Sequence, residues 1–219
     1  YDVHGFTIVN TDERYDEQDM VERVVGDLSL RHTSVRIRSQ AFLSELRTLV
    51  RHHDAPVYTI SYYVHWMLQR AIAENGYRVA ISGTAADELF SGYYDHQNAY
   101  LYEVCSDPAL FETALAAWTR HVRPIVRNPF LGNARVFIEN PGLRDHLFLD
   151  AAGFAQYLHQ PWSEPFREVR YTDSLLRNRM LNELFRESVP QILHEDDLNA
   201  MFFSIENRSP FLDRALFDF

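Results

Sequence analysis

Residues 77–96 read YRVAISGTAADELFSGYYDH, and this stretch decides the predicted fold. Its apolar run at 79–81 (Val-Ala-Ile) is typical of a strand buried on both faces. Ser82-Gly83 then breaks the strand. Asp87-Glu88 indicates the first turn of a helix, because acidic residues are favoured near the positive N-terminal end of a helix. Gly92 is expected to close that helix.

A strand, a glycine-containing loop and a helix N-terminus in this order can form an anion site. Free backbone N–H groups converge there, at a place where a phosphate could bind. The same loop has a structural explanation, since Thr84 followed three residues later by Asp87 is also a helix-capping pattern. The loop alone therefore leaves open both a nucleotide site and an ordinary strand-to-helix turn.

The first ninety or so residues alternate strand and helix. Apolar and β-branched residues predict strands at 3–9 and 33–37. Apolar residues at helical spacing predict helices after Asp16 and after Ser39, which would be the N-caps, and a further helix at about 61–74. This order favours an α/β fold with a parallel sheet covered by helices on both faces.

Ligands of such sheets bind at the carboxyl ends of the strands. Ile8 and Ser82 lie at two predicted strand ends and could face one crevice. After about residue 96 the strand pattern stops. We therefore expect an α/β nucleotide-binding part at 1–96, incomplete at its N-terminus, and a helical part of the same unit at 97–219.

Two helices are expected in the helical part. One starts at Asp107-Pro108 and closes near Pro124, and residues 129–141 follow as a loop. The other begins after Thr172 as its cap and ends at Pro190.

Composition narrows the class of protein. The chain has 219 residues, of which 46% are hydrophobic, so a globular protein is expected. A net charge of −10 argues against a nucleic-acid partner. No apolar run is long enough to span a membrane and no signal-peptide pattern opens the chain. Cys105 is the single cysteine, which favours a reducing cytoplasm.

The basic residues are also informative. All 21 are Arg and the chain has no Lys. A phosphate clamp within these residues would therefore use Arg, His, backbone N–H groups or a metal ion. Because the chain starts with Tyr1, almost directly in a strand, we interpret it as a piece of a longer protein.

Two motifs resemble those of one enzyme family. Residues 82–93, SGTAADELFSGY, resemble the signature S-G-E-G-x-D-E-x-x-x-G-Y of asparagine synthetase-type ATP pyrophosphatases. Residues 197–213, DLNAMFFSIENRSPFLD, resemble the pattern D-R-x-S-M-x-x-S-x-E-x-R-x-P-F-L-D of the same family. Two motifs in the right order are far more specific than one. The resemblance implies an adenine nucleotide alpha hydrolase-like fold.

The resemblance also implies roles for particular residues. Ser82 and Gly83 correspond to positions that contact ATP, and Ile8 to a position whose backbone meets the adenine. Asp87 corresponds to the metal-binding position, and Glu88 beside it is a second candidate ligand for Mg²⁺. Core packing explains Ile8 equally well.

Some positions in the motifs depart from the family pattern or have two explanations. Thr84 stands where the family has a Glu implicated in forming the acyl-adenylate, and a hydroxyl cannot replace a carboxylate as a base or metal ligand. Ala85 replaces a family Gly. Arg208 could contact a phosphate or an acidic substrate, but a structural pair with Glu206 is the favoured interpretation.

The function implied by the resemblance is that of a synthetase domain in a glutamine-dependent amidotransferase. ATP and Mg²⁺ would activate a carboxylate as an acyl-adenylate, and ammonia from an N-terminal glutaminase domain would displace AMP. A homodimer is compatible with this arrangement. Since the family's S-G-G-x-D-S loop and a downstream Lys are missing here, we expect the fragment alone to be inactive.

Three alternatives stay open. Thr84 suggests another acceptor than aspartate, such as a uronic acid of a surface polysaccharide. A related ligase could make an internal amide ring without ammonia. A descendant without catalytic activity could keep the fold and bind a partner.

Overall fold

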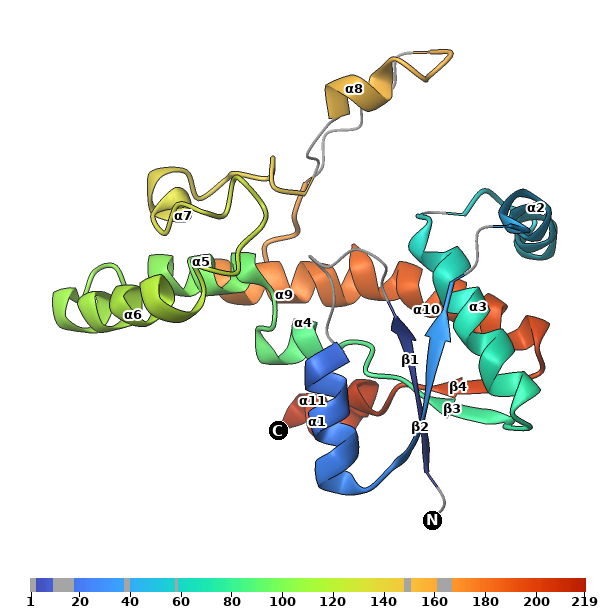
Figure 1. Cartoon of the computed structure of the whole chain (residues 1–219). Helices are drawn as coiled ribbons and strands as arrows, with labels where there is room; N and C mark the ends of the chain where they lie inside the picture. Colours follow the sequence, from blue (N-terminus) through green and yellow to red (C-terminus); the bar gives the residue numbers. More distant parts are fainter. Residues whose placement is uncertain (1–2, 10–17, 38–39, 58, 148–150, 161–166) are drawn as a thin grey trace. The chain divides into compact units, whose positions relative to one another are not determined.

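A computed structural model describes residues 3–9, 18–37, 40–57, 59–147, 151–160 and 167–219 (Figure 1). The predicted caps Asp16 and Ser39 lie outside these residues. In chain order the strands and helices are β1 His4–Val9, α1 Gln18–Leu28, β2 Arg31–Arg36, α2 Phe42–His53, α3 Ser61–Glu74, β3 Val79–Ile81, α4 Ala86–Phe90, α5 Tyr94–Glu103, α6 Pro108–His121, α7 Val136–Glu139, α8 Ala151–Ala155, α9 Leu175–Phe185, α10 Ser188–Phe202, β4 Glu206–Arg208, the 3-10 helix Pro210–Leu212 and α11 Arg214–Asp218.

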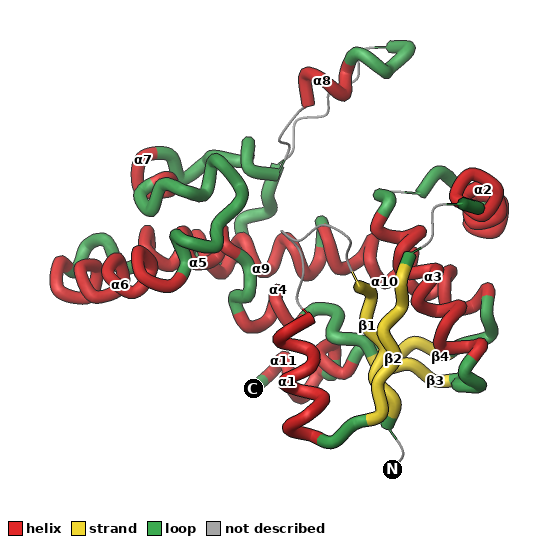
Figure 2. The backbone as a smooth tube through the Cα atoms, viewed as in Figure 1, coloured by secondary structure: helices red, strands yellow, loops and turns green. Residues whose placement is uncertain are grey.

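The chain divides into two compact units. The first unit consists of Tyr1–Thr84 and Gln191–Asp213. The second consists of Ala85–Pro190 and Arg214–Phe219. All four strands belong to the first unit, and the described secondary structure of the second is helical (Figure 2).

The strands of the first unit form two parallel pairs. β1 pairs with β2, with Ile8 opposite Val35, and β3 pairs with β4, with Ala80 opposite Asn207. The two pairs are separate two-stranded sheets and run in different directions (Figure 1). The predicted α/β class with parallel strands is therefore confirmed, while the described residues form two small sheets instead of one.

β3 corrects one prediction. Its residues were expected to be buried on both faces, but Val79 is 44% exposed and Ile81 is 73% exposed. Ala80 between them packs against the apolar cluster around Ile72 and Ile205. Within the described residues β3 has β4 as its one partner strand. Val79 and Ile81 therefore face solvent instead of a layer of helices.

The core of the first unit is formed mainly by α2 and α3. Leu49 is fully buried and packs with Tyr63, Trp66 and Met67, which project from one side of α3. Tyr62, Tyr63 and Trp66 are each less than 5% exposed, so these aromatic residues are part of the core.

The second unit is built on helices that the sequence predicts in part. Asp107 caps α6 as expected, accepting hydrogen bonds from the N–H groups of Ala109 and Leu110 at 3.1 Å. The cap of α9 is Ser174 and not Thr172, whose hydroxyl accepts from the Ser174 N–H. No described helix is both long enough and apolar enough to span a membrane.

Pro190 was expected to end a helix but lies in the first turn of α10. Proline is tolerated there because the first N–H groups of a helix have no partner within it. α9 ends five residues earlier, at Phe185.

Candidate functional site

The loop after β3 is joined to the end of β4 by hydrogen bonds within the first unit. The Ser82 N–H donates to the Arg208 carbonyl at 2.9 Å, which extends the β3–β4 ladder by one residue. The Ser82 hydroxyl oxygen lies 3.0 Å from Oγ1 of Thr84 and 3.2 Å from Oγ of Ser209. Three hydroxyl groups are thus linked at the carboxyl ends of two parallel strands, where ligands of such sheets bind.

Gly83 lies at the open side of this loop. It is exposed, and a Cβ atom built on it would meet no described atom within 4 Å. Its φ lies outside the left-handed region, so the backbone conformation does not demand glycine here. The backbone of residue 83 is therefore accessible to a ligand, which is the property that a phosphate-binding loop needs.

A polar pocket lies next to the hydroxyl groups in the first unit. Its volume is about 390 Å³, and it is lined by Leu193, His194, Asp197, Asn207 and Ser209. The carboxamide oxygen of Asn207 is buried and has no hydrogen-bond partner among the described residues. A buried acceptor without a partner carries a desolvation cost, which a ligand with an N–H or O–H donor would relieve.

Ile8 lies near the end of β1 and is half-buried. β1 has β2 as its one partner strand in the described part of the chain, so the other edge of its backbone is not paired in a sheet. That edge is compatible with a backbone contact to a ligand. Ile8 and Ser82 thus belong to one unit but to different two-stranded sheets.

Arg208 forms the ion pair with Glu206 that the sequence suggested. Its Nε donates to Glu206 Oε1 at 2.8 Å, and both side chains are at least 60% exposed. The hydrogen bond and the nearby negative charge raise the pKa of Arg208 above its ordinary value. An exposed pair of this kind contributes little to stability.

The two acidic residues of the first motif, Asp87 and Glu88, belong to the second unit and differ sharply in their exposure to solvent. Asp87 is exposed, whereas Glu88 is 3% exposed. Glu88 Oε1 accepts hydrogen bonds from the Tyr93 hydroxyl at 2.9 Å and from the Ser188 hydroxyl at 3.2 Å. Burial and the Glu88 carboxylate raise the pKa of Tyr93, which keeps this phenol protonated as a donor. Of the two carboxylates, Asp87 is the accessible one.

The start of α4 shows how the motif is built. Its N-cap is Ala85, which has a φ of 74° and makes no side-chain cap. The alternative of a capping pattern from Thr84 to Asp87 is therefore wrong, because the residue in the cap position has no polar side chain. The Gly92 N–H closes the helix by donating to the Asp87 carbonyl at 3.0 Å.

Comparisons with known proteins identify the family of the chain. The family model described as asparagine synthase matches residues 1–219, the whole chain. The chain belongs to the asparagine synthase family. It is 23% identical to asparagine synthetase [glutamine-hydrolyzing] 1 of Bacillus subtilis (strain 168) over 97% of its own length. It spans 35%, about a third, of that relative.

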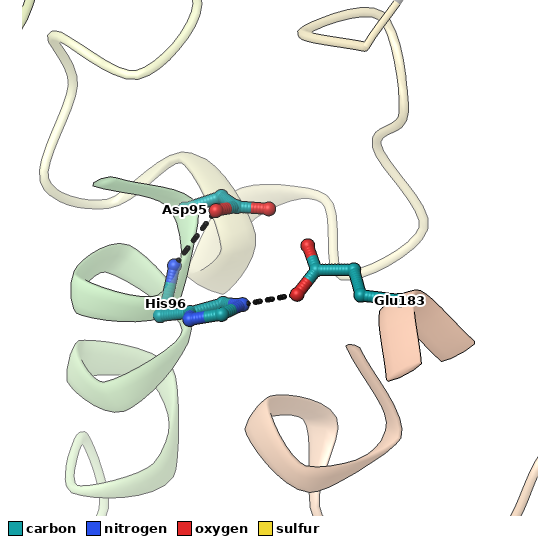
Figure 3. Close-up of side chains that lie close together, drawn as sticks. All are labelled: Asp95, His96 and Glu183. Carbon is teal, nitrogen blue, oxygen red and sulfur yellow. Dashed lines mark hydrogen bonds and ion pairs between the residues drawn. The ribbon is translucent and has the colours of Figure 1, made fainter. Parts of the chain in front are cut away.

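This member of the asparagine synthase family also carries a buried charged cluster that the motifs do not include. In the second unit His96 Nε2 lies 2.6 Å from Glu183 Oε2, and the His96 N–H donates to Asp95 Oδ1 at 3.1 Å (Figure 3). All three residues are at most 5% exposed. Their ligand atoms lie within 4.8 Å of one another, a spacing that a metal ion could bridge.

Arg179 already supplies the positive charge of this cluster. Its Nε lies 2.9 Å from Glu183 Oε1 and 3.4 Å from Asp95 Oδ2. The same guanidinium binds Glu168 and Glu187. A cation within hydrogen-bond distance of two of the three candidate ligands would repel a metal ion, so the cluster is best explained as a structural ion-pair network.

The electrostatics of the network follow from burial and pairing. Burial alone would raise the pKa of Asp95, but the hydrogen bond from His146 and the charges of His96 and Arg179 lower it overall. Burial raises the pKa of Glu187 in spite of Arg179. The surrounding carboxylates raise the pKa of Arg179, so the guanidinium stays charged although it is 3% exposed.

Sequence reasoning missed this network. Its residues are spread over three segments, and no motif joins Asp95 to Glu183. The one local signal is the spacing of Arg179 and Glu183, four residues apart on one helix face. That spacing is common on exposed helices, so it does not by itself indicate a buried network.

Proposed function

We propose that this chain is the ATP-dependent amide-forming synthetase part of a glutamine-dependent amidotransferase. The observation that carries the proposal is the family match over the whole chain, and it is supported by an open loop after β3 whose sequence resembles the family's ATP-binding motif. Since the chain spans about a third of its curated relative, the glutaminase that would supply ammonia belongs to the rest of the protein.

In the first unit, Ser82 and Gly83 would bind ATP. The exposed backbone of Gly83 leaves room for a phosphate, and the Ser82 hydroxyl, shared with Thr84 and Ser209, can turn its proton toward an anionic oxygen. Ile8, near the carboxyl end of β1, would contact the adenine through its backbone. These are binding and orienting roles, which suit a reaction that depends mainly on positioning and charge neutralisation.

In the second unit, Asp87 would be the ligand of Mg²⁺. Its exposed carboxylate suits a hard cation such as Mg²⁺. Glu88 was also a candidate ligand, but its accepting oxygen is engaged by Tyr93 and Ser188, so we propose that it holds α4 in place.

The reaction would proceed in two balanced steps. An oxygen of the acceptor carboxylate attacks the α-phosphorus of ATP, a new O–P bond forms, and pyrophosphate leaves. Ammonia then attacks the acyl carbon, an amide bond forms, AMP leaves with the electrons of the broken C–O bond, and the nitrogen releases one proton to solvent. Adenylation is useful because it replaces a poor leaving group with a good one.

The finer fold is also a proposal. Both strand pairs of the first unit are parallel, and β1 and β3 each have an edge without a partner strand in the described residues. We suggest that one additional strand, carrying the S-G-G-x-D-S loop, joins them into a single sheet. Adjacent strands rotate by about 20–25°, so pairs on either side of such a strand would point in different directions.

The identity of the acceptor carboxylate is the part of the proposed reaction that the site residues constrain least. The Thr84 hydroxyl shares one hydrogen bond with the Ser82 hydroxyl, in which either oxygen could be the donor, and four of the five residues that line the adjacent pocket are polar. Such a surface suits aspartate or an acid with hydroxyl groups, such as a uronic acid. It offers no carboxylate at position 84 to act as a base.

The test uses the full-length protein. AMP and pyrophosphate are measured with glutamine, ATP and Mg²⁺ and either aspartate or a panel of uronic acids. We expect formation of both products with at least one acid. D87N should abolish it, whereas E112Q, an exposed acidic residue on α6, should leave it unchanged.

Each other outcome would count against a particular part of the proposal. Activity that needs no ammonia source would favour an internal-amide ligase. No AMP with any acid would favour a binding protein without catalytic activity. AMP formation by residues 1–219 alone would contradict the need for the rest of the protein.

A further inference from the structure

Position 92 requires glycine because there is no room for a Cβ atom, and not because of its backbone conformation. Its φ does not lie in the left-handed region, unlike that of Gly76 at 87°. A Cβ atom at residue 92 would lie 2.9 Å from Asp87 Cβ and 2.6 Å from Asp87 Cγ. It would lie even closer to the Asp87 carboxylate oxygen Oδ1. The Asp87 side chain therefore occupies the place that any other residue at 92 would fill.

The contact is local and has few ways to relax. The Gly92 N–H binds the Asp87 carbonyl, so the two backbones are held together at the end of α4. A different rotamer of Asp87 could move the carboxylate away from a methyl group introduced at position 92. It could not move Asp87 Cβ, which is fixed by the helix backbone.

We infer that Gly92 is a positioning residue for the Asp87 carboxylate, and through it for a divalent cation. This inference rests on the proposed role of Asp87. The absence of a side chain at 92 lets the Asp87 carboxylate fold back over the end of α4, which is the orientation it has in the structure. Any side chain at 92 would push the carboxylate into another rotamer and shift the end of the helix.

The experiment measures Mn²⁺ binding to the full-length protein by electron paramagnetic resonance, in the presence of a non-hydrolysable ATP analogue. G92A should weaken Mn²⁺ binding about tenfold or more, as substitutions behind metal ligands commonly do. G132A is the matched control. It lies in the same unit, and its added methyl would make ordinary contact at 3.8 Å with the Pro129 carbonyl. It should bind Mn²⁺ like the wild type.

A double-mutant comparison separates positioning from general damage. If Gly92 acts through the carboxylate, G92A should weaken Mn²⁺ binding in the wild type but not further in D87N. Equal weakening in both backgrounds, or wild-type affinity in G92A, would overturn the inference.

Crystal structures of the wild type and G92A give a readout that does not depend on the metal. A displaced Asp87 carboxylate in G92A is expected, and an unmoved one would overturn the inference. If the wild type bound no Mn²⁺, the proposed metal role would fail. The two crystal structures would still decide whether Gly92 positions Asp87.

Discussion

The loop after β3 and the network around Arg179 use polar groups in opposite ways. In the loop, three hydroxyl groups and an exposed glycine lie beside open space, and the nearby Glu206–Arg208 pair is solvated. In the network, the buried guanidinium of Arg179 is paired with the buried carboxylates of Asp95 and Glu183. The comparison indicates that the exposed Glu206–Arg208 pair of the second motif contributes little to stability, while the buried charges around Arg179 support the fold.

Removing Arg179 should have the largest effect on stability. R179M keeps most of the side-chain volume but leaves Asp95 and Glu183 buried without their shared cation. Breaking a buried ion pair on one side costs about 3–5 kcal/mol. We expect the free energy of unfolding, measured with urea, to fall by that amount.

Arg170 provides the control for this substitution. It pairs with Asp173 at the surface, and its side chain is 78% exposed. R170M should unfold at nearly the same urea concentration as the wild type. If R179M behaved like R170M, the network would not be a structural element, and the distinction between the two regions would fail.

Acid should weaken the network through Asp95. Because its pKa is lowered from 3.8 in the folded state, Asp95 contributes stability that is complete above pH 3.8. This contribution is lost as the pH falls through the lower folded value. At pH 6 we expect D95N to be less stable than the wild type by about 1.5–3 kcal/mol, the usual range for a hydrogen bond to a charged group.

The difference between D95N and the wild type should shrink below pH 3.8. Glu187 should change the free energy of unfolding in the opposite direction. Because its pKa is raised in the folded state, its ionisation lowers the stability as the pH rises. Urea unfolding between pH 3 and pH 6 measures both trends. D173N is a control at an exposed position, and its free energy of unfolding should change with pH in the same way as that of the wild type. A constant difference for D95N at every pH would contradict the assignment.

The smallest effect on stability is expected at Arg208. R208Q removes an exposed pair, so its unfolding midpoint should match that of the wild type and of R214Q, whose Arg is 93% exposed. The turnover of the full-length protein then separates the two interpretations. Lost AMP formation would indicate a phosphate or substrate contact, and unchanged turnover would indicate a surface pair alone.

Local patterns explain which parts of the fold the sequence predicts. The helix expected at 61–74 is α3, Ser61–Glu74, because its aromatic and apolar residues repeat at helical spacing and a glycine turn ends it. β4 was not predicted. Its residues Glu-Asn-Arg have no strand pattern and become a strand because β3 offers a parallel partner far away in the sequence.

The same limit applies to the candidate site, where the sequence predicts residues of a contiguous motif but not contacts between distant segments. The motif locates Ser82, Gly83 and Asp87 because it is a short contiguous stretch. It does not predict that Glu88 points inward, since that depends on Tyr93 and a helix about 100 residues later. The Arg179 network depends wholly on packing between distant segments, so single-sequence patterns carry almost no information about it.

The brevity of β3 has a consequence for handling the protein. A strand with apolar residues on an open edge is a template on which other chains can add by backbone pairing. β3 has three residues, with Val79 and Ile81 exposed. A three-residue edge is too short to hold a second chain in register, and short edge strands are one of the ways in which proteins resist aggregation. The shortness of β3 therefore helps to keep these described residues from polymerising through this edge.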